Sequence, residues 1–149
     1  MAQTTSPRLA EIVSALPLRA GMRVLEIGCG PGVAARAVLD RIGSGYVLAI
    51  DRSAKAIAQA KAGSRAELAT GRLEFRRIAV EHFALAEGEK PYDLAFAVRV
   101  GALDGRHPEA GVLALQRLRA VLARNGRLFI DGGNPLKELT LQMQPRASK

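Results

Sequence analysis

The stretch VLEIGCGPG, residues 24–32, leads from an apolar segment into three glycines that are spaced by single residues. Its start favours a short buried strand over residues 22–27, and apolar residues at helical spacing predict a helix over residues 32–42. Glycines at such a junction let the main chain adopt dihedral angles closed to other residues and approach a ligand closely. The stretch therefore predicts a loop that holds a small polar ligand at the carboxyl end of a strand.

Strands and helices alternate along the rest of the chain. Further helices are expected over residues 7–16, 53–62 and 108–123, with a broken helical stretch to residue 69, and further strands over residues 46–50, 73–78, 92–98 and 127–130. The expected strands are almost continuously apolar, which is typical of a parallel sheet covered on both faces. We predict a doubly wound α/β fold in a single domain, with an N-terminal helix (1–18), a ligand-binding core (19–133) and a short tail (134–149).

Two classes of ligand compete for the glycine loop. Dinucleotide sites use G-x-G-x-x-G, whereas Gly28, Gly30 and Gly32 here are one residue closer together. Glu26 brings negative charge to the loop, which disfavours a diphosphate and favours a ligand with a positive amino group. Asp51 ends the second strand, 21 residues after Gly30, where an acid accepts hydrogen bonds from ribose hydroxyls. Asp51 fits both classes, but Glu26 and Gly32 favour the cationic ligand.

Four segments in order resemble the class I S-adenosylmethionine-dependent methyltransferases. They are VLEIGCGPG, AIDRS with Asp51, YDLAFAVRV with Asp93, and LRAVLARNGRLFIDG, within a span from about Arg19 to Gly133. The resemblance implies a Rossmann-like fold, S-adenosyl-L-methionine as cofactor and S-adenosyl-L-homocysteine as product.

The resemblance also assigns site residues. It implies that Gly28, Cys29 and Gly30 border the methionine part of the cofactor, that Glu26 helps to hold its amino group, and that Asp51 binds the ribose. Arg52 would lie beside the adenine. The full set of expected cofactor-binding residues is Glu26, Gly28, Cys29, Gly30, Gly32, Asp51, Arg52, Val80, Glu81 and Arg99. No catalytic residue and no metal ligand is assigned.

The sequence departs from the family's pattern in three places. Ala79 stands where an aspartate often contacts the adenine, so recognition there would rest on backbone groups, Val80 and Glu81. Only one helix precedes the first strand, which leaves little chain for a lid over the cofactor. After Gly133 the remaining residues are too few for the usual terminal helix and antiparallel hairpin. We therefore expect the hairpin to be reduced or missing, the sheet to end near the fifth strand, and either a homodimer that covers the open edge or a shortened chain.

Composition limits the other classes of protein. The chain has 149 residues, a net charge of +8 and one cysteine, Cys29, which excludes an internal disulfide framework. It has no apolar run of the roughly 20 residues that span a membrane and no secretory leader, so a cytoplasmic location is the default. The basic residues are scattered, which favours a general compositional bias, although RNA binding is an alternative.

The expected function is methyl transfer to a small-molecule acceptor. Alternatives are an RNA or protein methyltransferase, a cofactor-binding module or partner subunit without catalysis, and, least favoured, a nicotinamide enzyme. Residues 99–107 follow the fourth strand and should face the reacting methyl group. Within them, Arg99 either binds an acidic acceptor or marks a strand end, and His107 is either a general base or an exposed residue before a helix. Asp93 is expected to have a structural role, because it starts the fourth strand at the opposite end of the sheet.

Overall fold

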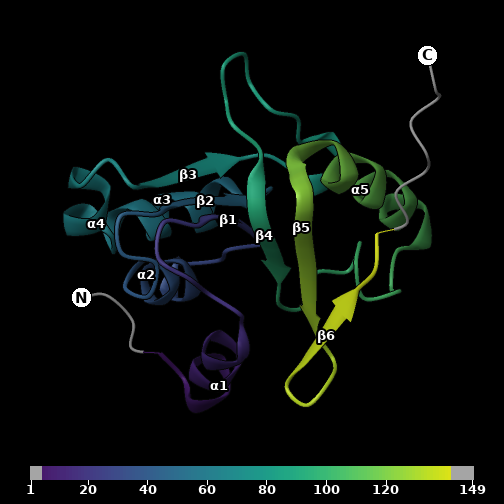
Figure 1. Ribbon diagram of the computed structural model, residues 1–149, viewed down its shortest axis with the longest axis horizontal. Helices are drawn as coiled ribbons and strands as arrows, with labels where there is room; N and C mark the ends of the chain where they lie inside the picture. The colour runs from purple at the N-terminus through teal and green to yellow at the C-terminus, as the bar shows by residue number, and fades with distance from the viewer. Residues whose placement is uncertain (1–4, 142–149) are drawn as a thin grey trace.

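The structure is a computed structural model that describes residues 5–141, and the strands among them form one six-stranded sheet (Figure 1). The elements follow in the order α1 (Pro7–Ala15), β1 (Arg23–Ile27), α2 (Val33–Leu39), β2 (Tyr46–Asp51), α3 (Ala54–Ala62), α4 (Arg65–Ala69), β3 (Leu73–Arg77), the 3-10 helix η1 (Val80–His82), β4 (Tyr92–Ala97), α5 (Pro108–Val121), β5 (Leu122–Asp131) and β6 (Leu136–Leu139). The strand order is β3-β2-β1-β4-β5-β6, with β1 to β5 parallel and β6 antiparallel to β5.

The centre of the sheet is the place where the strand order reverses. β1 pairs with β2 on one side and with β4 on the other, so the chain runs outward in both directions from β1. In open sheets of this kind, ligands bind at the carboxyl ends of the strands beside such a reversal. The parallel pairing of β1 to β5 confirms the predicted α/β, mostly parallel architecture. The glycine loop follows β1 directly and therefore lies at the point where the strand order reverses.

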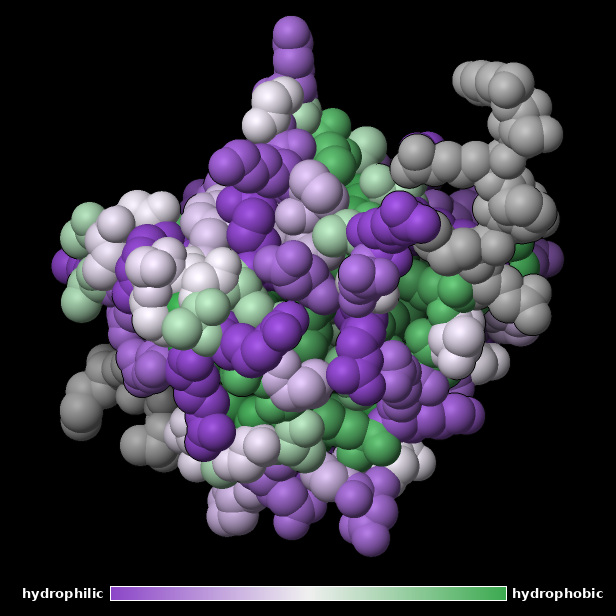
Figure 2. All heavy atoms as spheres, in the orientation of Figure 1, coloured by the Kyte–Doolittle hydropathy of each residue, from purple (hydrophilic) through white to green (hydrophobic). Residues whose placement is uncertain are grey.

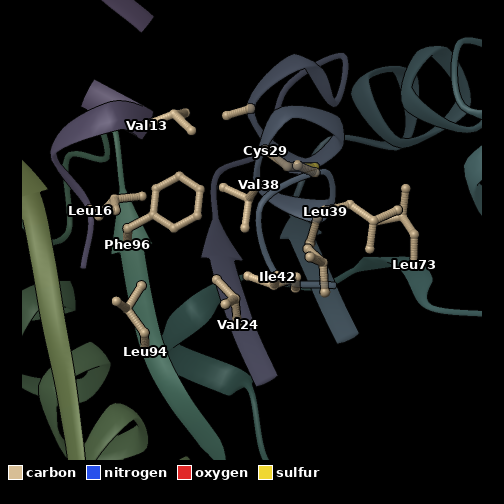
Figure 3. Packing of buried hydrophobic residues seen from close by; sticks show 14 of the residues in the cluster. Val13, Leu16, Val24, Cys29, Val38, Leu39, Ile42, Leu73, Leu94 and Phe96 are labelled. Atoms are coloured by element: carbon tan, nitrogen blue, oxygen red, sulfur yellow. The ribbon is translucent and has the colours of Figure 1, made fainter. Parts of the chain in front are cut away.

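Successive residues of a strand point alternately into two separate hydrophobic clusters, one on each face of the sheet. In β2, Val47 and Ala49 join the cluster beneath α1, α2 and α3, whereas Leu48 and Ile50 join the cluster beneath α5 and η1. Figure 3 shows part of the first cluster, to which Val13 of α1 and Phe96 of β4 both belong. Helices therefore cover both faces, as the apolar strands predict.

The sheet continues beyond the fifth strand, so the prediction that it ends there is wrong. β6 forms an antiparallel hairpin with β5, in which Leu128 is opposite Leu139 and Asp131 is opposite Leu136. The guanidinium of Arg127 pairs with the Glu138 carboxylate at 2.8 and 2.9 Å across the two strands. A short hairpin needs only a few residues after the turn, which is why the small number of residues after Gly133 suffices.

Asn125 and Gly126, between the expected helix and the expected fifth strand, predict a turn, but this turn is absent because β5 begins at Leu122 rather than at Arg127. Tyr92 is opposite Leu122 and Leu94 is opposite Arg127, so residues 123–126 all bulge opposite one residue of β4. The helix before it ends at Val121, two residues earlier than expected. Asn125 and Gly126 therefore belong to a bulge within β5 and not to a turn before it.

The spacing of apolar residues predicts that Val112, Leu115, Leu118 and Leu122 face the sheet, and only Val112 departs from this prediction, since Leu118 and Leu122 are buried and Leu115 is partly buried against the core. Ala114, Leu118 and Val121 are buried, but Val112 is 60% exposed. Spacing alone allowed either face, because Val112 and Leu113 put apolar side chains on the side of the helix away from the sheet as well.

Candidate functional site

The glycine loop bends tightly around the end of β2. The N–H groups of Gly28 and Cys29 both donate to the Ile50 carbonyl, at 2.8 and 3.0 Å. Gly28 has φ +70°, and a Cβ added there would come within 2.6 Å of the Val100 side chain. A side chain at this position would be strained by its backbone and would also collide with the loop after β4, so this glycine is required.

Asp51 is fixed by two backbone hydrogen bonds at the carboxyl end of β2. Its Oδ2 accepts from the Gly30 N–H and its Oδ1 accepts from the Ser53 N–H, each at 2.9 Å. These bonds tie the glycine loop to the start of α3. Each carboxylate oxygen has a second lone-pair direction, so Asp51 can still accept hydrogen bonds from a pair of ligand hydroxyls.

Glu26 is a buried acid with no partner for one oxygen. The residue is 3% exposed, and its Oε1 has no hydrogen bond among the described residues. Burial, and secondly the negative charge of Asp51, raise the pKa of Glu26 from its ordinary 4.5 to about 8, against the opposing effects of the Ala35 backbone and Arg36. An unpaired buried carboxylate is costly, and a cationic group beside it would remove that cost.

Cys29 and Gly32 face the opposite side of the loop. Cys29 is 5% exposed within the cluster beneath α2, and burial raises the pKa of its thiol. Gly32 has φ +87° at the start of α2, and an added Cβ would lie 2.9 Å from the Phe75 ring. These two positions allow the loop to pack on the core and do not form the walls of the cavity described next.

A cavity of about 790 Å³ opens beside the carboxyl ends of β1, β2 and β4 and extends to the start of α5. Six expected cofactor-binding residues line it: Gly28, Asp51, Arg52, Val80, Glu81 and Arg99. Glu26, Cys29, Gly30 and Gly32 are not among its lining residues. The structure therefore brings six of the ten expected positions to one hollow and places the other four in or beneath the glycine loop.

The loop between β4 and α5 forms another wall of the cavity, and the sequence predicts its residues only in part. Arg106 belongs to the expected segment 99–107 but was given no role of its own, although it lines the cavity and its guanidinium donates to the Arg99 carbonyl at 3.0 Å. The His107 ring also lines the cavity and lies against Gly101, where an added Cβ would overlap it. Nothing in the local sequence indicates that Arg106 turns back toward the end of β4.

Asp93 has the structural role that its position predicts. It lies at the amino end of β4, away from the cavity, and its Oδ2 accepts from the Arg23 N–H at 2.8 Å. This bond joins the starts of the neighbouring strands β4 and β1.

The described part of the chain shows neither a metal centre nor a membrane span. Between residues 5 and 141, no three His, Cys, Asp or Glu side chains gather closely enough to hold a metal ion. No helix in the same range is long and apolar enough to cross a membrane. Figure 2 shows hydrophilic side chains spread widely over the visible face instead of being gathered over one element.

Comparison with solved structures places this fold among known methyltransferases. A S-adenosylmethionine-dependent methyltransferase from Thiobacillus denitrificans, in complex with S-adenosyl-L-homocysteine, aligns with a TM-score of 0.65 and 25% identity over 85% of this chain and 48% of that one. A phosphoethanolamine N-methyltransferase from Haemonchus contortus aligns with a TM-score of 0.68 over 86% of this chain and 26% of that one, and at 19% identity it supports the fold alone.

Sequence comparisons reach the same family. Two curated relatives named protein-L-isoaspartate O-methyltransferase, from Methylorubrum populi and Methylorubrum extorquens, are 39% and 40% identical over 93% of this chain. The chain spans only 58% and 54% of their lengths. A family model described as a methyltransferase domain matches residues 24–126, which contain the glycine loop, Asp51 and all the residues that line the cavity. The chain therefore belongs to the methyltransferase domain family.

Proposed function

We propose that this chain binds S-adenosyl-L-methionine and transfers its methyl group to an acceptor, with S-adenosyl-L-homocysteine as the product. The observation that carries the proposal is the pair of acids on either side of the glycine loop. Asp51 is held rigidly at the end of β2, and Glu26 is buried with an oxygen that has no partner. A ligand with a ribose and an ammonium group satisfies both acids, whereas a dinucleotide satisfies only Asp51.

Different residues of the chain would bind different parts of this cofactor. Asp51 would accept from the ribose hydroxyls, and Glu26 would balance the ammonium charge through the loop or through a water molecule. The backbone of Gly28 and Gly30 would border the methionine part. Arg52, Val80 and Glu81 also line the cavity, and an adenine would lie between Arg52 and the start of η1. Because Ala79 offers no carboxylate, backbone groups would read the adenine edge.

Bound S-adenosyl-L-methionine supplies a methyl group activated by a positively charged sulfur. In such a displacement, the acceptor's lone pair forms the new bond to carbon while the carbon–sulfur bond breaks. The residues that follow β4 also line the cavity, so they would align the acceptor. Alignment of this kind supplies much of the rate enhancement when the nucleophile needs no early loss of a proton. Where the nucleophile must lose a proton early, His107 among these residues could take up that proton.

A small molecule is the acceptor that we favour, because the basic residues are scattered along the sequence and form no dense run of the kind that binds nucleic acid. A protein carboxyl group is the second candidate, and the names of the two Methylorubrum relatives support it. The net charge of +8 keeps RNA as a further candidate. A homodimer and a cytoplasmic location stay predictions.

The test is a methyl-transfer assay with radiolabelled S-adenosyl-L-methionine. The purified chain would be offered a small-molecule panel, a peptide that contains isoaspartate, and total RNA, with the Asp51→Ala variant as the control. Label transferred by the native chain and lost in the variant would support the proposal and identify the class of acceptor. Tight cofactor binding with no transfer to any class would instead favour a binding module or partner subunit.

A further inference from the structure

Arg99 has an unusual backbone conformation at the cavity wall. It lies two residues after the end of β4, and its φ is +58°. Among residues 5–141, it is the only residue other than glycine with a positive φ. L-residues with long side chains rarely adopt this region, and such conformations persist only where their surroundings hold them.

Two side chains hold the Arg99 backbone, one on each side. The Arg99 N–H donates to Asp131 Oδ1 at 3.0 Å, and the Arg99 carbonyl accepts from Arg106 Nη2 at 3.0 Å. Arg106 is in turn paired with the Asp104 carboxylate at 2.8 Å. The bend at Arg99 is therefore supported from β5 and from the loop that leads to α5.

Asp131 connects this bend to the rest of the fold. It is the last residue of β5, and its side chain is only 13% exposed. While Oδ1 accepts from Arg99, Oδ2 lies 3.6 Å from the guanidinium of Arg8 on α1. Arg8 is 57% exposed, so this ion pair contributes little by itself. The hydrogen bond to Arg99 is the contact that distinguishes Asp131 from an ordinary acid at a strand end.

We propose that Asp131 is a positioning residue, which holds Arg99 in its left-handed conformation and thereby fixes the part of the cavity wall that follows β4. A turn follows Arg99, in which the N–H groups of Leu103 and Asp104 both donate to the Val100 carbonyl, each at 3.0 Å. A change of direction at Arg99 would displace this turn together with His107. The role in shaping an acceptor site rests on the proposed function, but the effect of Asp131 on the backbone does not.

The experiment compares Asp131→Ala with Asp131→Asn, using amide hydrogen exchange at residue 99. Alanine removes the acceptor, so we expect the residue 99 amide to exchange about tenfold faster or more. Asparagine keeps an oxygen at the Oδ1 position, so protection should stay close to that of the native chain. Arg8→Gln is the matched control, because it removes the ion pair and leaves the hydrogen bond in place. Unchanged exchange in Asp131→Ala would overturn the proposal.

A second measurement separates positioning from general stabilisation. Glycine adopts a positive φ without support, so Asp131→Ala should shift the urea midpoint less in the Arg99→Gly background than in the native background. Equal shifts in the two backgrounds would contradict a role through the Arg99 conformation. If Asp131→Ala does not fold, Asp131→Asn still tests the contact, because a neutral acceptor should move the residue 99 amide proton upfield. No movement would overturn the proposal.

Binding of S-adenosyl-L-homocysteine completes the test. We expect Asp131→Ala to weaken it by about 2- to 10-fold, the effect of one hydrogen bond that supports the wall, and Asp131→Asn to weaken it less. If the native chain itself does not bind this ligand, the proposed function fails, and the exchange measurements still decide the role of Asp131.

Discussion

Replacing Glu26 by glutamine removes a buried ionisable group without changing the shape of the side chain. In the folded chain the pKa of Glu26 is raised from 4.5 to about 8, chiefly by burial. The folded state therefore holds a proton that the unfolded state has lost over the window between these two values, and stability falls as the pH rises through that window. At about 1.4 kcal/mol per pH unit, the native chain should lose about 4 kcal/mol relative to Glu26→Gln between pH 5 and pH 9.

Urea unfolding of both proteins at these two pH values measures this difference directly, because the other titrating groups are common to both. Saturating S-adenosyl-L-homocysteine should reduce the pH dependence of the native chain, since its ammonium group favours the ionised carboxylate. The same ligand should bind Glu26→Gln more weakly. Parallel stability curves for the two proteins from pH 5 to pH 9 would refute the reasoning, because they would mean that Glu26 is ionised and solvated in the free chain.

Three further predictions follow from packing. Gly28→Ala should destabilise the chain by about 1–3 kcal/mol and weaken cofactor binding, because its φ is +70° and the new Cβ would meet Val100; thermal unfolding and calorimetry would test this. Leu118→Ala should cost about 2–5 kcal/mol in urea unfolding, whereas Val112→Ala on the exposed side of the same helix should change stability by less than about 0.5 kcal/mol. The buried thiol of Cys29, with its raised pKa, should resist iodoacetamide until urea unfolds the chain, as mass spectrometry would show.

Local sequence signals were enough to predict the glycine loop and the strands around it. The VLEIGCGPG stretch carries its own strand, glycines and acid, and Asp51 is at the end of the next apolar run. Since parallel strands place their carboxyl ends at one edge of the sheet, this order alone brings Asp51 beside Gly30, where the two are now joined by a hydrogen bond. The residues were predictable because each depends on a short segment and on a general rule of α/β sheets.

The rest depends on pairing between distant segments, which the sequence does not encode locally. The bulge at residues 123–126 is defined only against Asp93 of β4, and β6 exists only as a partner of β5. The exposure of Val112, which spacing placed on the same inward face as Leu118, depends on how α5 rotates over the sheet. Arg106 donates to the Arg99 carbonyl, and Arg99 has a positive φ, a conformation that nothing in its sequence neighbours indicates.

Calorimetric titration with S-adenosyl-L-methionine and S-adenosyl-L-homocysteine tests the central claim most directly, with NAD and the Asp51→Ala variant as controls. The account predicts binding of both sulfur ligands to the native chain, no binding of NAD, and at least about a tenfold loss of affinity in the variant, because Asp51 would accept charge-assisted hydrogen bonds from the ribose. Absence of binding by the folded native chain, or equal affinity in Asp51→Ala, would contradict the claim that the glycine loop and its two acids form a cofactor site.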